Sequence, residues 1–397
     1  MNDKNRQQPK PKHIVIIAGE ASGDLHAANL VKEILAKAPD TVFSGIGGTL
    51  MQEVGVKIIS DLARYGVTGI VEVIKHLKVI KQAFRATQKH LQTVKPDLLI
   101  LVDYPGFNLR LAKYAKQVLG LRIIYYISPQ LWAWKPGRIK VIQQNIDHMA
   151  VIFPFEKTIY EDANVDVSFV GHPLTMPEAE TKRSLTCEAI HIPSTGKRLA
   201  ILPGSRINEI ERHLPVLFET AKKLRSIYPD LHCVIPIAKT LTPEQIKRYW
   251  HEDEVPTSFI ENQKATEVAN LCDAIIVASG TASLECALLA KPMCIIYKVH
   301  LITAIAAAIF LRVQYIGLCN LLSKRMIVPE LLQYDCNATE LTRVVSSLID
   351  ASSPLNQKVT KQLISLKKAL SGDTADTSFC SLVLNTLAQE KKIANAP

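Results

Sequence analysis

The chain has 397 residues, of which 48% are hydrophobic; this is enough apolar material for large cores, and the length predicts two domains or three. The formal net charge of +10 favours an anionic partner, which is a nucleic acid, an acidic lipid surface or a phosphorylated substrate. None of the eight cysteines has a C-x-x-C or other metal-ligand spacing, so they are expected to be reduced and buried, as in a cytosolic protein.

The first half alternates apolar strand-like runs with stretches of helical periodicity. Residues 1–12 are expected to form a disordered basic tail, and the apolar run that begins at His13 is too short for a secretory signal. The alternation predicts a parallel sheet with helices on both faces, and therefore a Rossmann-like domain over 13–175. The predicted strands are 14–18, 98–102, 121–127 and 148–153, and the predicted helices include 24–36, 71–90 and 108–119.

The alternation stops in a polar segment at about 173–197 and then starts again. A second Rossmann-like domain is predicted over 176–350, followed by helices over 351–397 that either cross back to the first domain or are exchanged in a dimer. Two doubly wound domains leave a cleft at the carboxyl ends of their strands, where ligands of such α/β folds bind. The predicted strands are 199–203, 232–238, 257–260, 274–278 and 293–297, with a helix over 209–226.

A turn of small residues, Gly204 and Ser205, follows the first strand of the second domain and leads into a helix. Such a turn directs free backbone N–H groups and the positive end of the helix dipole at one point. Arg206 lies in the first turn, where a cation is disfavoured by roughly 0.3–1 kcal/mol unless an anion is also present. The pattern therefore predicts an anion site, for which a diphosphate is suitable.

A second turn of the same kind, Ser279-Gly280-Thr281, follows the strand at 274–278. Glu285 lies four residues after Thr281 and shares a face of the next helix with it, one residue too far for a capping box. Its carboxylate either accepts hydrogen bonds from ribose hydroxyls or interacts only with the helix dipole. The pairing of the two turns favours the nucleotide interpretation.

Asp103 ends the apolar strand 98–102 of the first domain. Desolvation at the end of a buried strand raises the pKa of a carboxyl group toward the range that a general base needs. The alternative is an ordinary turn residue at the start of a helix.

Small residues also follow the first strand, in the segment that contains Gly19, Glu20, Ser22 and Gly23. The segment lacks the G-x-G-x-x-G fingerprint, which argues against a dinucleotide cofactor. Its small residues still allow a substrate to approach closely, so this turn is the candidate acceptor side.

Two segments are candidates for contact with a membrane. Residues 70–90 carry an apolar stripe beside a basic stripe, which suits an anionic bilayer surface but is also typical of a helix that covers a core. Residues 299–311 are apolar but shorter than the roughly 20 residues that span a bilayer. Trp132 and Trp134 lie near cations, but one such cluster is weak support for nucleic-acid binding, and no nucleic-acid partner is predicted.

Seven motifs in order resemble the lipid-A-disaccharide synthase family, and the resemblance covers all but about the first dozen and last twenty residues. Their order and number make the resemblance specific, although each motif alone is not. They are AGEASGD at 18–24, VDYPGFN at 102–108, YYISPQLWAW at 125–134, FPFE at 153–156, LPGSR at 202–206, SGTASLE at 279–285 and NLL at 320–322.

The resemblance implies a GT-B glycosyltransferase that needs no metal or other cofactor. It implies that UDP-2,3-diacylglucosamine and 2,3-diacylglucosamine 1-phosphate are joined into a β-1,6-linked disaccharide, with release of UDP. It also implies a homodimer on the cytoplasmic face of the inner membrane of a Gram-negative bacterium. Arg206 and the two turns are expected to hold the phosphates and Glu285 the ribose, with Asn320 and Gln333 completing the UDP pocket, while Asp103 is the expected base.

Two other functions are compatible with these residues. One is a different UDP-sugar enzyme of the same architecture, namely a polyprenyl-acceptor transferase or a UDP-sugar epimerase, which needs no acceptor. The other is a non-catalytic basic protein that binds membrane or RNA. The joint presence of Arg206, Glu285 and Asp103 argues against the second, because a pure binder does not need all three.

Overall fold

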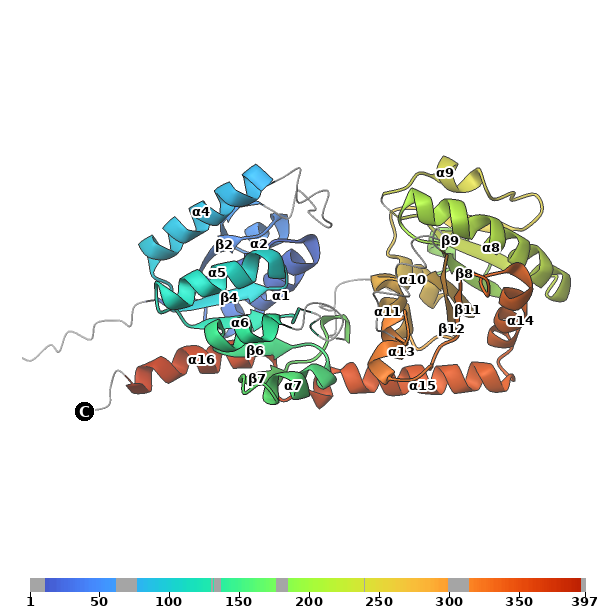
Figure 1. The fold of residues 1–397 in the computed structure, drawn as a ribbon. Coiled ribbons are helices and arrows are strands. Elements are labelled where there is room, and N and C mark those ends of the chain that lie inside the picture. The colour runs from blue at the N-terminus through green and yellow to red at the C-terminus, as the bar shows by residue number, and fades with distance from the viewer. Residues whose placement is uncertain are drawn as a thin grey trace, which may run out of the picture. The chain divides into compact units, whose positions relative to one another are not determined.

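The structure is a computed structural model that describes residues 11–61, 77–129, 131, 137–175, 185–238, 240–298 and 314–393. The chain forms two compact units. The first consists of Met1–Pro173 together with Leu370–Pro397, and the second of Leu174–Ala369. Each is a parallel sheet with helices packed on it, so the predicted α/β class is confirmed (Figure 1).

The first unit has a seven-stranded parallel sheet in the order β3-β2-β1-β4-β5-β6-β7. Its central strand β4 is the apolar run LLILV, and every residue of it is buried because helices cover both faces. The strands are β1 His13–Ala18, β2 Val42–Ile46, β3 Lys57–Ser60, β4 Leu98–Val102, β5 Ile123–Tyr126, β6 His148–Val151 and β7 Val167–Phe169. The helices are α1 Ala21–Lys37, α2 Thr49–Glu53, α4 Leu77–Val94, α5 Pro105–Gln117, α6 Arg138–Asn145, α7 Pro154–Glu161 and α16 Phe379–Ile393.

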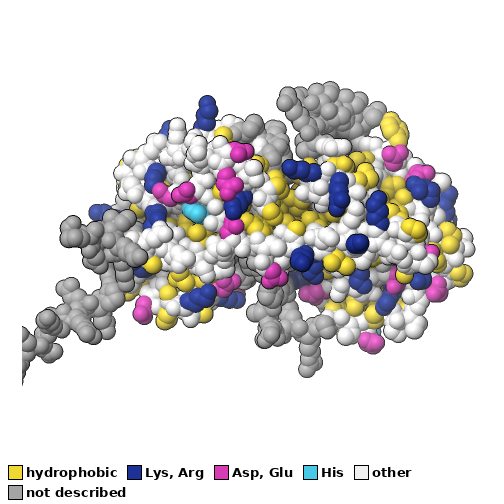
Figure 2. Space-filling view, turned by 90° about the horizontal axis from the view of Figure 1, so that it is seen from below, with side chains coloured by type: hydrophobic (Ala, Val, Ile, Leu, Met, Phe, Trp, Pro, Cys, Tyr) yellow, Lys and Arg dark blue, Asp and Glu magenta, His cyan; other side chains and the backbone are white. Residues whose placement is uncertain are grey.

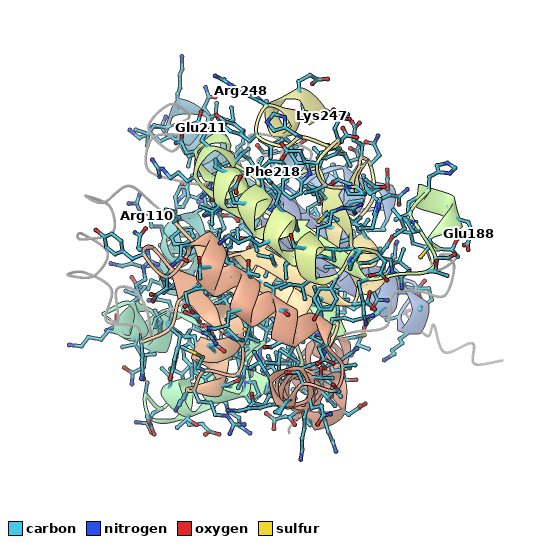
Figure 3. The ribbon with its side chains drawn as sticks, turned by 90° about the vertical axis from the view of Figure 1, so that its right-hand side faces the viewer. Arg110, Glu188, Glu211, Phe218, Lys247 and Arg248 are labelled. Atoms are coloured by element: carbon cyan, nitrogen blue, oxygen red, sulfur yellow. The ribbon has the colours of Figure 1, made fainter. Side chains whose placement is uncertain are left out.

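The second unit has a six-stranded parallel sheet in the order β10-β9-β8-β11-β12-β13. Its longest helix, α8, carries Phe218 (Figure 3). This ring packs edge-on against Trp250, with centroids 5.3 Å apart. The strands are β8 Arg198–Leu202, β9 His232–Pro236, β10 Thr257–Ile260, β11 Ala274–Ala278, β12 Met293–Tyr297 and β13 Glu330–Leu332. The helices are α8 Ile207–Ile227, α9 Pro243–Lys247, α10 Ala265–Asn270, α11 Thr281–Ala287, α13 Leu318–Ser323, α14 Ala338–Ile349 and α15 Pro354–Leu370.

The strand order reverses once in each sheet. The chain adds strands on one side of β1 and then on the other side from β4, and it does the same at β8 and β11. Because the connections after neighbouring strands then leave in opposite directions, a crevice opens at the carboxyl ends of the central pair. In the second unit, one turn of the predicted nucleotide site follows β8 and the other follows β11. In the first unit, the predicted acceptor-side turn follows β1, and the candidate base Asp103 follows β4.

Four strands differ from the sequence-based prediction, which missed β2, β3, β7 and β13. β2 has the sequence VFSGI, in which Ser44 and Gly45 interrupt the apolar run, and the other three lie near or at sheet edges and have three or four residues. Short edge strands carry little hydrophobic signal. The predicted helix at 108–119 begins earlier, at Pro105, since proline is well suited to the first helical position.

The last part of the chain packs on the first unit. Asp376 accepts hydrogen bonds from the Phe169 amide and from Lys157 Nζ, each at 2.9 Å. Further along, the ring of Phe379 stacks on Tyr126 with centroids 4.0 Å apart. The first unit is therefore completed by residues that follow the whole second unit in the sequence.

Several predicted features lie outside the described residues. These are the tail up to residue 10, the apolar run 299–311, the pair Trp132 and Trp134, and the first part of the amphipathic stretch at 70–76. In the part of the chain that the structure describes, no helix is both long enough and apolar enough to cross a bilayer.

Candidate active site

The turn between β8 and α8 is built around a carboxylate of its own helix. Glu209 Oε2 accepts the backbone N–H groups of Ser205 at 2.9 Å and Arg206 at 3.3 Å. Gly204 has φ +125°, and a Cβ there would lie 2.3 Å from Glu209 Oε2, so this close wrapping requires glycine. The two amides predicted to be free are thus satisfied internally. Among the described residues, the Ile207 and Asn208 amides at the start of α8 have no acceptor.

Arg206 presents its guanidinium to solvent. The side chain is 79% exposed, and its Nη1 lies 3.5 Å from Glu209 Oε1, an ion pair that leaves most of the guanidinium donors available. Exposed pairs of this kind contribute little to stability. The ion pair therefore gives the cation little role in folding, and an anionic ligand at this turn stays the prediction.

A buried histidine connects this turn to the end of β12. The His213 ring is fully buried; its Nδ1 lies 2.6 Å from the Pro203 carbonyl and its Nε2 lies 3.0 Å from the Lys298 amide nitrogen. A carbonyl only accepts and an amide N–H only donates, so Nδ1 carries the proton and Nε2 accepts. Burial lowers the pKa of His213, which keeps this neutral form.

The second turn lies beside the first because their strands are paired. Val277 of β11 is in register with Leu202 of β8, so the segments that follow them emerge next to each other. Gly280 has φ +153° and precedes α11, and Thr281 is exposed. The Ser279 amide donates to the Ile296 carbonyl at 2.9 Å. The structure therefore brings together the two predicted phosphate turns.

Glu285 lies one turn into α11 and is partly buried. Burial raises the pKa of its carboxyl group, and the positive charge of Lys264 opposes the rise. Such a carboxylate needs hydrogen-bond donors when it is ionised, and vicinal hydroxyl groups are suitable donors, so the predicted contact with ribose stays a prediction.

Asn320 uses its side-chain amide for hydrogen bonds within the second unit. Its side chain is fully buried, and Nδ2 donates to the Val328 carbonyl and to Glu330 Oε1, both at 2.7 Å. Its Oδ1 accepts the amides of Ile327 at 2.8 Å and Val328 at 2.9 Å. The side-chain amide thus has a structural role within the protein, and a contact of Asn320 with UDP stays a prediction.

That structural role still reaches the second turn. Glu330 also accepts the amides of Ile316 and Gly317, each at 3.0 Å, and the Ile316 carbonyl accepts a longer hydrogen bond of 3.4 Å from Ser279 Oγ. Asn320 therefore helps to fix the segment beside Ser279. Gln333 follows β13 and has φ +49°. Its backbone N–H donates to the Tyr297 carbonyl at 2.9 Å, which places it at the carboxyl ends of the strands, as the two turns are.

In the first unit, the predicted acceptor-side turn and Asp103 are also adjacent. Ala18 of β1 is in register with Val102 of β4, so Gly19 and Asp103 follow paired residues. Gly19 is buried under Tyr104, and a Cβ at Gly19 would lie 2.3 Å from that ring. Gly23 is buried at the start of α1, and Ser22 is exposed.

Two carboxyl groups that follow these strands, those of Asp103 and Glu20, have raised pKa values. Burial raises the pKa of Asp103, while a hydrogen bond from the Tyr104 amide opposes the rise. Burial also raises the pKa of Glu20, and the negative charge of Asp103 adds to that effect. A partly buried carboxylate with a raised pKa, next to a second acidic group, is suited to accept a proton near neutral pH.

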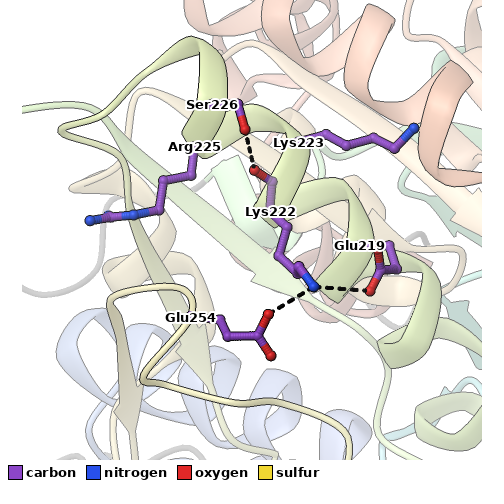
Figure 4. A pocket seen from close by; sticks show the side chains of 6 residues that line it. All are labelled: Glu219, Lys222, Lys223, Arg225, Ser226 and Glu254. Carbon is purple, nitrogen blue, oxygen red and sulfur yellow. Dashed lines mark hydrogen bonds and ion pairs between the residues drawn. The ribbon is translucent and has the colours of Figure 1, made fainter.

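The described residues contain no group of three His, Cys, Asp or Glu side chains placed to hold a metal ion. They do contain a hollow of about 540 Å³ that is lined by residues of α8 and by Glu254 (Figure 4). Its Lys222 is paired with Glu254 at 2.7 Å and Glu219 at 3.7 Å. Because α8 runs antiparallel to the strands, this hollow lies toward the amino ends of the sheet, away from the two turns.

Solved structures with the same fold define the class of protein. A glycotransferase of kitacinnamycin superposes with a TM-score of 0.62 at 14% identity, covering 95% of this chain and 100% of that one. The UDP-GlcNAc 2-epimerase of Neisseria meningitidis superposes with a TM-score of 0.57 at 12% identity, covering 95% of this chain and 100% of that one. The fold is that of the GT-B glycosyltransferases, with candidate residues at the switch point of each sheet.

Sequence comparison identifies the family within that class. The lipid-A-disaccharide synthetase family matches residues 14–382. Lipid-A-disaccharide synthase 1 of Legionella pneumophila (strain Lens) is 53% identical over 383 residues, which is 96% of this chain and 99% of that protein. The lipid-A-disaccharide synthase of Trichlorobacter lovleyi is 39% identical over 381 residues, again 96% of this chain and 99% of that protein. The chain belongs to the lipid-A-disaccharide synthase family, and it is an enzyme of the glycosyltransferase class.

Glu209 is the main site residue that the sequence-based prediction missed. A signal was present, because a glutamate three residues after the residue that precedes a helix is the spacing of a capping box. Arg206 stands where that motif has serine or threonine, which hid the pattern.

The Glu209 carboxylate should stabilise the protein through this turn. Glu209→Ala removes the acceptor of two amides, so the free energy of unfolding should fall by about 1–2 kcal/mol. Glu211→Ala is the matched control on the same helix, where the side chain is exposed (Figure 3). Chemical denaturation measures both, and equal stability of the two variants would contradict the role of Glu209.

Proposed function

We propose that the enzyme transfers the diacylglucosaminyl group of UDP-2,3-diacylglucosamine to the 6-hydroxyl of 2,3-diacylglucosamine 1-phosphate. The products are the β-1,6-linked disaccharide 1-phosphate and UDP. The supporting observation is the division of chemistry between the two switch points: a cationic turn for a diphosphate in the second unit and a desolvated carboxyl group in the first. Family membership supports the choice of substrates.

In this proposal the second unit binds the nucleotide. Arg206 and the outward-facing amides at the start of α8 contact the diphosphate, together with the turn at Ser279 and Gly280. Glu285 accepts hydrogen bonds from the ribose. Fixed donors near the bond that breaks stabilise the charge that develops on the departing UDP, and loss of one such donor typically lowers turnover by on the order of a hundredfold.

The first unit supplies the base. Asp103 takes the proton from the 6-hydroxyl of the acceptor, and the oxygen attacks the anomeric carbon as UDP leaves, so the configuration inverts. Gly19, Glu20, Ser22 and Gly23 line the acceptor side. Burial raises the pKa of Asp103, which increases its basicity, and burial together with the negative charge of Asp103 in turn raises the pKa of Glu20.

The acyl chains of both substrates require the enzyme to reach a membrane. We propose that it docks on the cytoplasmic face of the inner membrane through cations, among them Lys78, Lys81, Arg85 and Lys89, which are exposed on α4. The apolar side of α4 is already occupied, because Ile80 and Phe84 pack against the core of the first unit. On the face shown in Figure 2, Lys and Arg side chains are interspersed with apolar and acidic ones. The homodimer implied by the family resemblance stays a prediction.

Arg206→Ala should weaken UDP binding by at least about tenfold, because the site loses its exposed cation. Isothermal titration with UDP measures this. Arg343→Ala is the matched control, since Arg343 also forms an exposed ion pair with a glutamate three residues away on a helix of the second unit. Wild-type affinity in Arg206→Ala would exclude the guanidinium from the site.

Asp103→Asn should bind UDP normally but release no UDP from the two diacyl sugars, because the amide cannot take the proton. The wild-type protein should release UDP only when both sugars are present, whereas release without the acceptor would indicate a different reaction. Asp97→Asn, just before the other end of the same strand, controls for loss of a partly buried, hydrogen-bonded carboxylate. Turnover by Asp103→Asn would remove Asp103 from the role of base.

Replacement of the four α4 cations by glutamine should weaken binding to vesicles that contain phosphatidylglycerol by at least about tenfold at low salt, given about 1 kcal/mol per cation near the surface. The control replaces four exposed lysines of α15, which are Lys358, Lys361, Lys367 and Lys368. Vesicle cosedimentation measures both. A protein that stays off such vesicles at low salt, or a larger loss in the α15 variant, would contradict docking through α4.

A further inference from the structure

The turn that carries Asp103 has an unfavourable backbone. Asp103 has φ +45° and Tyr104 has φ +48°, so two consecutive residues with side chains are in the left-handed region. Each such residue costs of order 1–3 kcal/mol and persists only where its surroundings hold it. Rotation of the peptide between Asp103 and Tyr104 would relieve the strain at Tyr104 and change the direction of the Asp103 carbonyl.

Two buried side chains prevent this rotation by holding that carbonyl. The Asp103 carbonyl accepts a hydrogen bond of 2.6 Å from the Tyr125 hydroxyl and one of 2.7 Å from Asn108 Nδ2. Asn108 Nδ2 also lies 3.1 Å from the Val102 carbonyl. Tyr125 and Asn108 are both fully buried, and they come from β5 and α5, two different elements that follow the turn in the sequence.

The same peptide affects the Asp103 carboxyl group directly. Its N–H, which belongs to Tyr104, lowers the pKa of the Asp103 carboxyl group and so counteracts part of the rise caused by burial. Rotation of the peptide would withdraw the carbonyl from Asn108 and Tyr125 and, at the same time, withdraw the N–H from the carboxylate. The position and the acidity of the carboxyl group are therefore coupled to the two buried donors.

We propose that Asn108 and Tyr125 are positioning residues for Asp103: by holding its carbonyl, they keep the carboxylate directed at the acceptor hydroxyl. This inference rests on the proposed function of Asp103 as the base. Both side chains act through Asp103 and neither touches the substrate. Asn108 Oδ1 is buried and has no hydrogen-bond partner within the described residues, so the amide group is retained mainly for its donor.

The test compares Tyr125→Phe and Asn108→Ser with matched controls. Tyr125→Phe removes only a hydroxyl, and its control is Tyr126→Phe, a buried tyrosine that follows it on the same strand. Asn108→Ser is matched by Asn145→Ser, which removes another buried asparagine of the first unit whose amide bonds elsewhere. Thermal melts identify any variant that does not fold.

Each test variant should lower kcat by at least about tenfold, because misplacement of a reacting group by about 1 Å can cost a hundredfold. The KM for UDP-2,3-diacylglucosamine should stay within about twofold, because the second unit is unchanged. Loss of the Tyr104 N–H raises the pKa of Asp103, so the acid limb of the kcat profile should move to higher pH. A purely structural role would lower stability without moving that limb.

The outcomes separate the two proposals. If Asp103→Asn stops turnover while Tyr125→Phe and Asn108→Ser keep the kcat and pH profile of their controls, Asp103 remains the base and the positioning role is overturned. If Asp103→Asn keeps its turnover, the proposed function of Asp103 fails, and the positioning role fails with it. A loss of kcat with a shifted acid limb in both test variants, and in neither control, supports the inference.

Discussion

The arrangement of this enzyme depends on one reversal of strand order in each parallel sheet. Between β1 and β4, and again between β8 and β11, the chain stops adding strands on one side and starts on the other. The carboxyl ends of parallel strands all lie on the same side of the sheet. At the reversal, the connections that follow the two neighbouring strands go to opposite faces, so the space between these strand ends stays open. The residues that immediately follow these four strands are small, charged or strained, whereas the strands themselves are apolar and buried.

The two reversals have opposite electrostatic character. In the second unit, an exposed guanidinium lies at the positive end of a helix of 21 residues, an arrangement that a bound anion would make favourable. In the first unit, two carboxyl groups share a partly buried space in which both are harder to ionise. One sheet architecture thus presents an exposed cation at one reversal and desolvated carboxyl groups at the other, because the side chains at the turns differ while the scaffold does not.

The sequence predicted the parts of the structure that depend on runs of apolar residues. The strand 98–102 and the turn at Gly204 were identified because a continuous apolar segment followed by small residues is typical of a buried strand that ends in a turn. The strand Val42–Ile46 was missed because Ser44 and Gly45 hide the pattern, and only pairing with β1 identifies it as a strand.

Contacts between side chains that are distant in the sequence were not predictable. Asn320 was expected at the ligand, but its amide bonds to the segment at 327–330, which depends on how that loop folds back. The left-handed backbone of Asp103 and Tyr104 had no clear signal in the residue types, because Tyr104 is not a residue that favours such a conformation. The hydroxyl that stabilises it comes from Tyr125 on the next strand, and sequence periodicity does not specify that contact.

The packing of Phe379 and Asp376 on the first unit has a consequence for synthesis on the ribosome. The seven strands of the first sheet are translated before the second unit, but the helix that covers Tyr126 is translated after it. At about 5–20 residues per second, the intervening segment takes roughly 10 to 40 s to emerge. During that interval Tyr126 lacks the ring that stacks on it in the finished protein, and the Phe169 amide lacks its carboxylate acceptor.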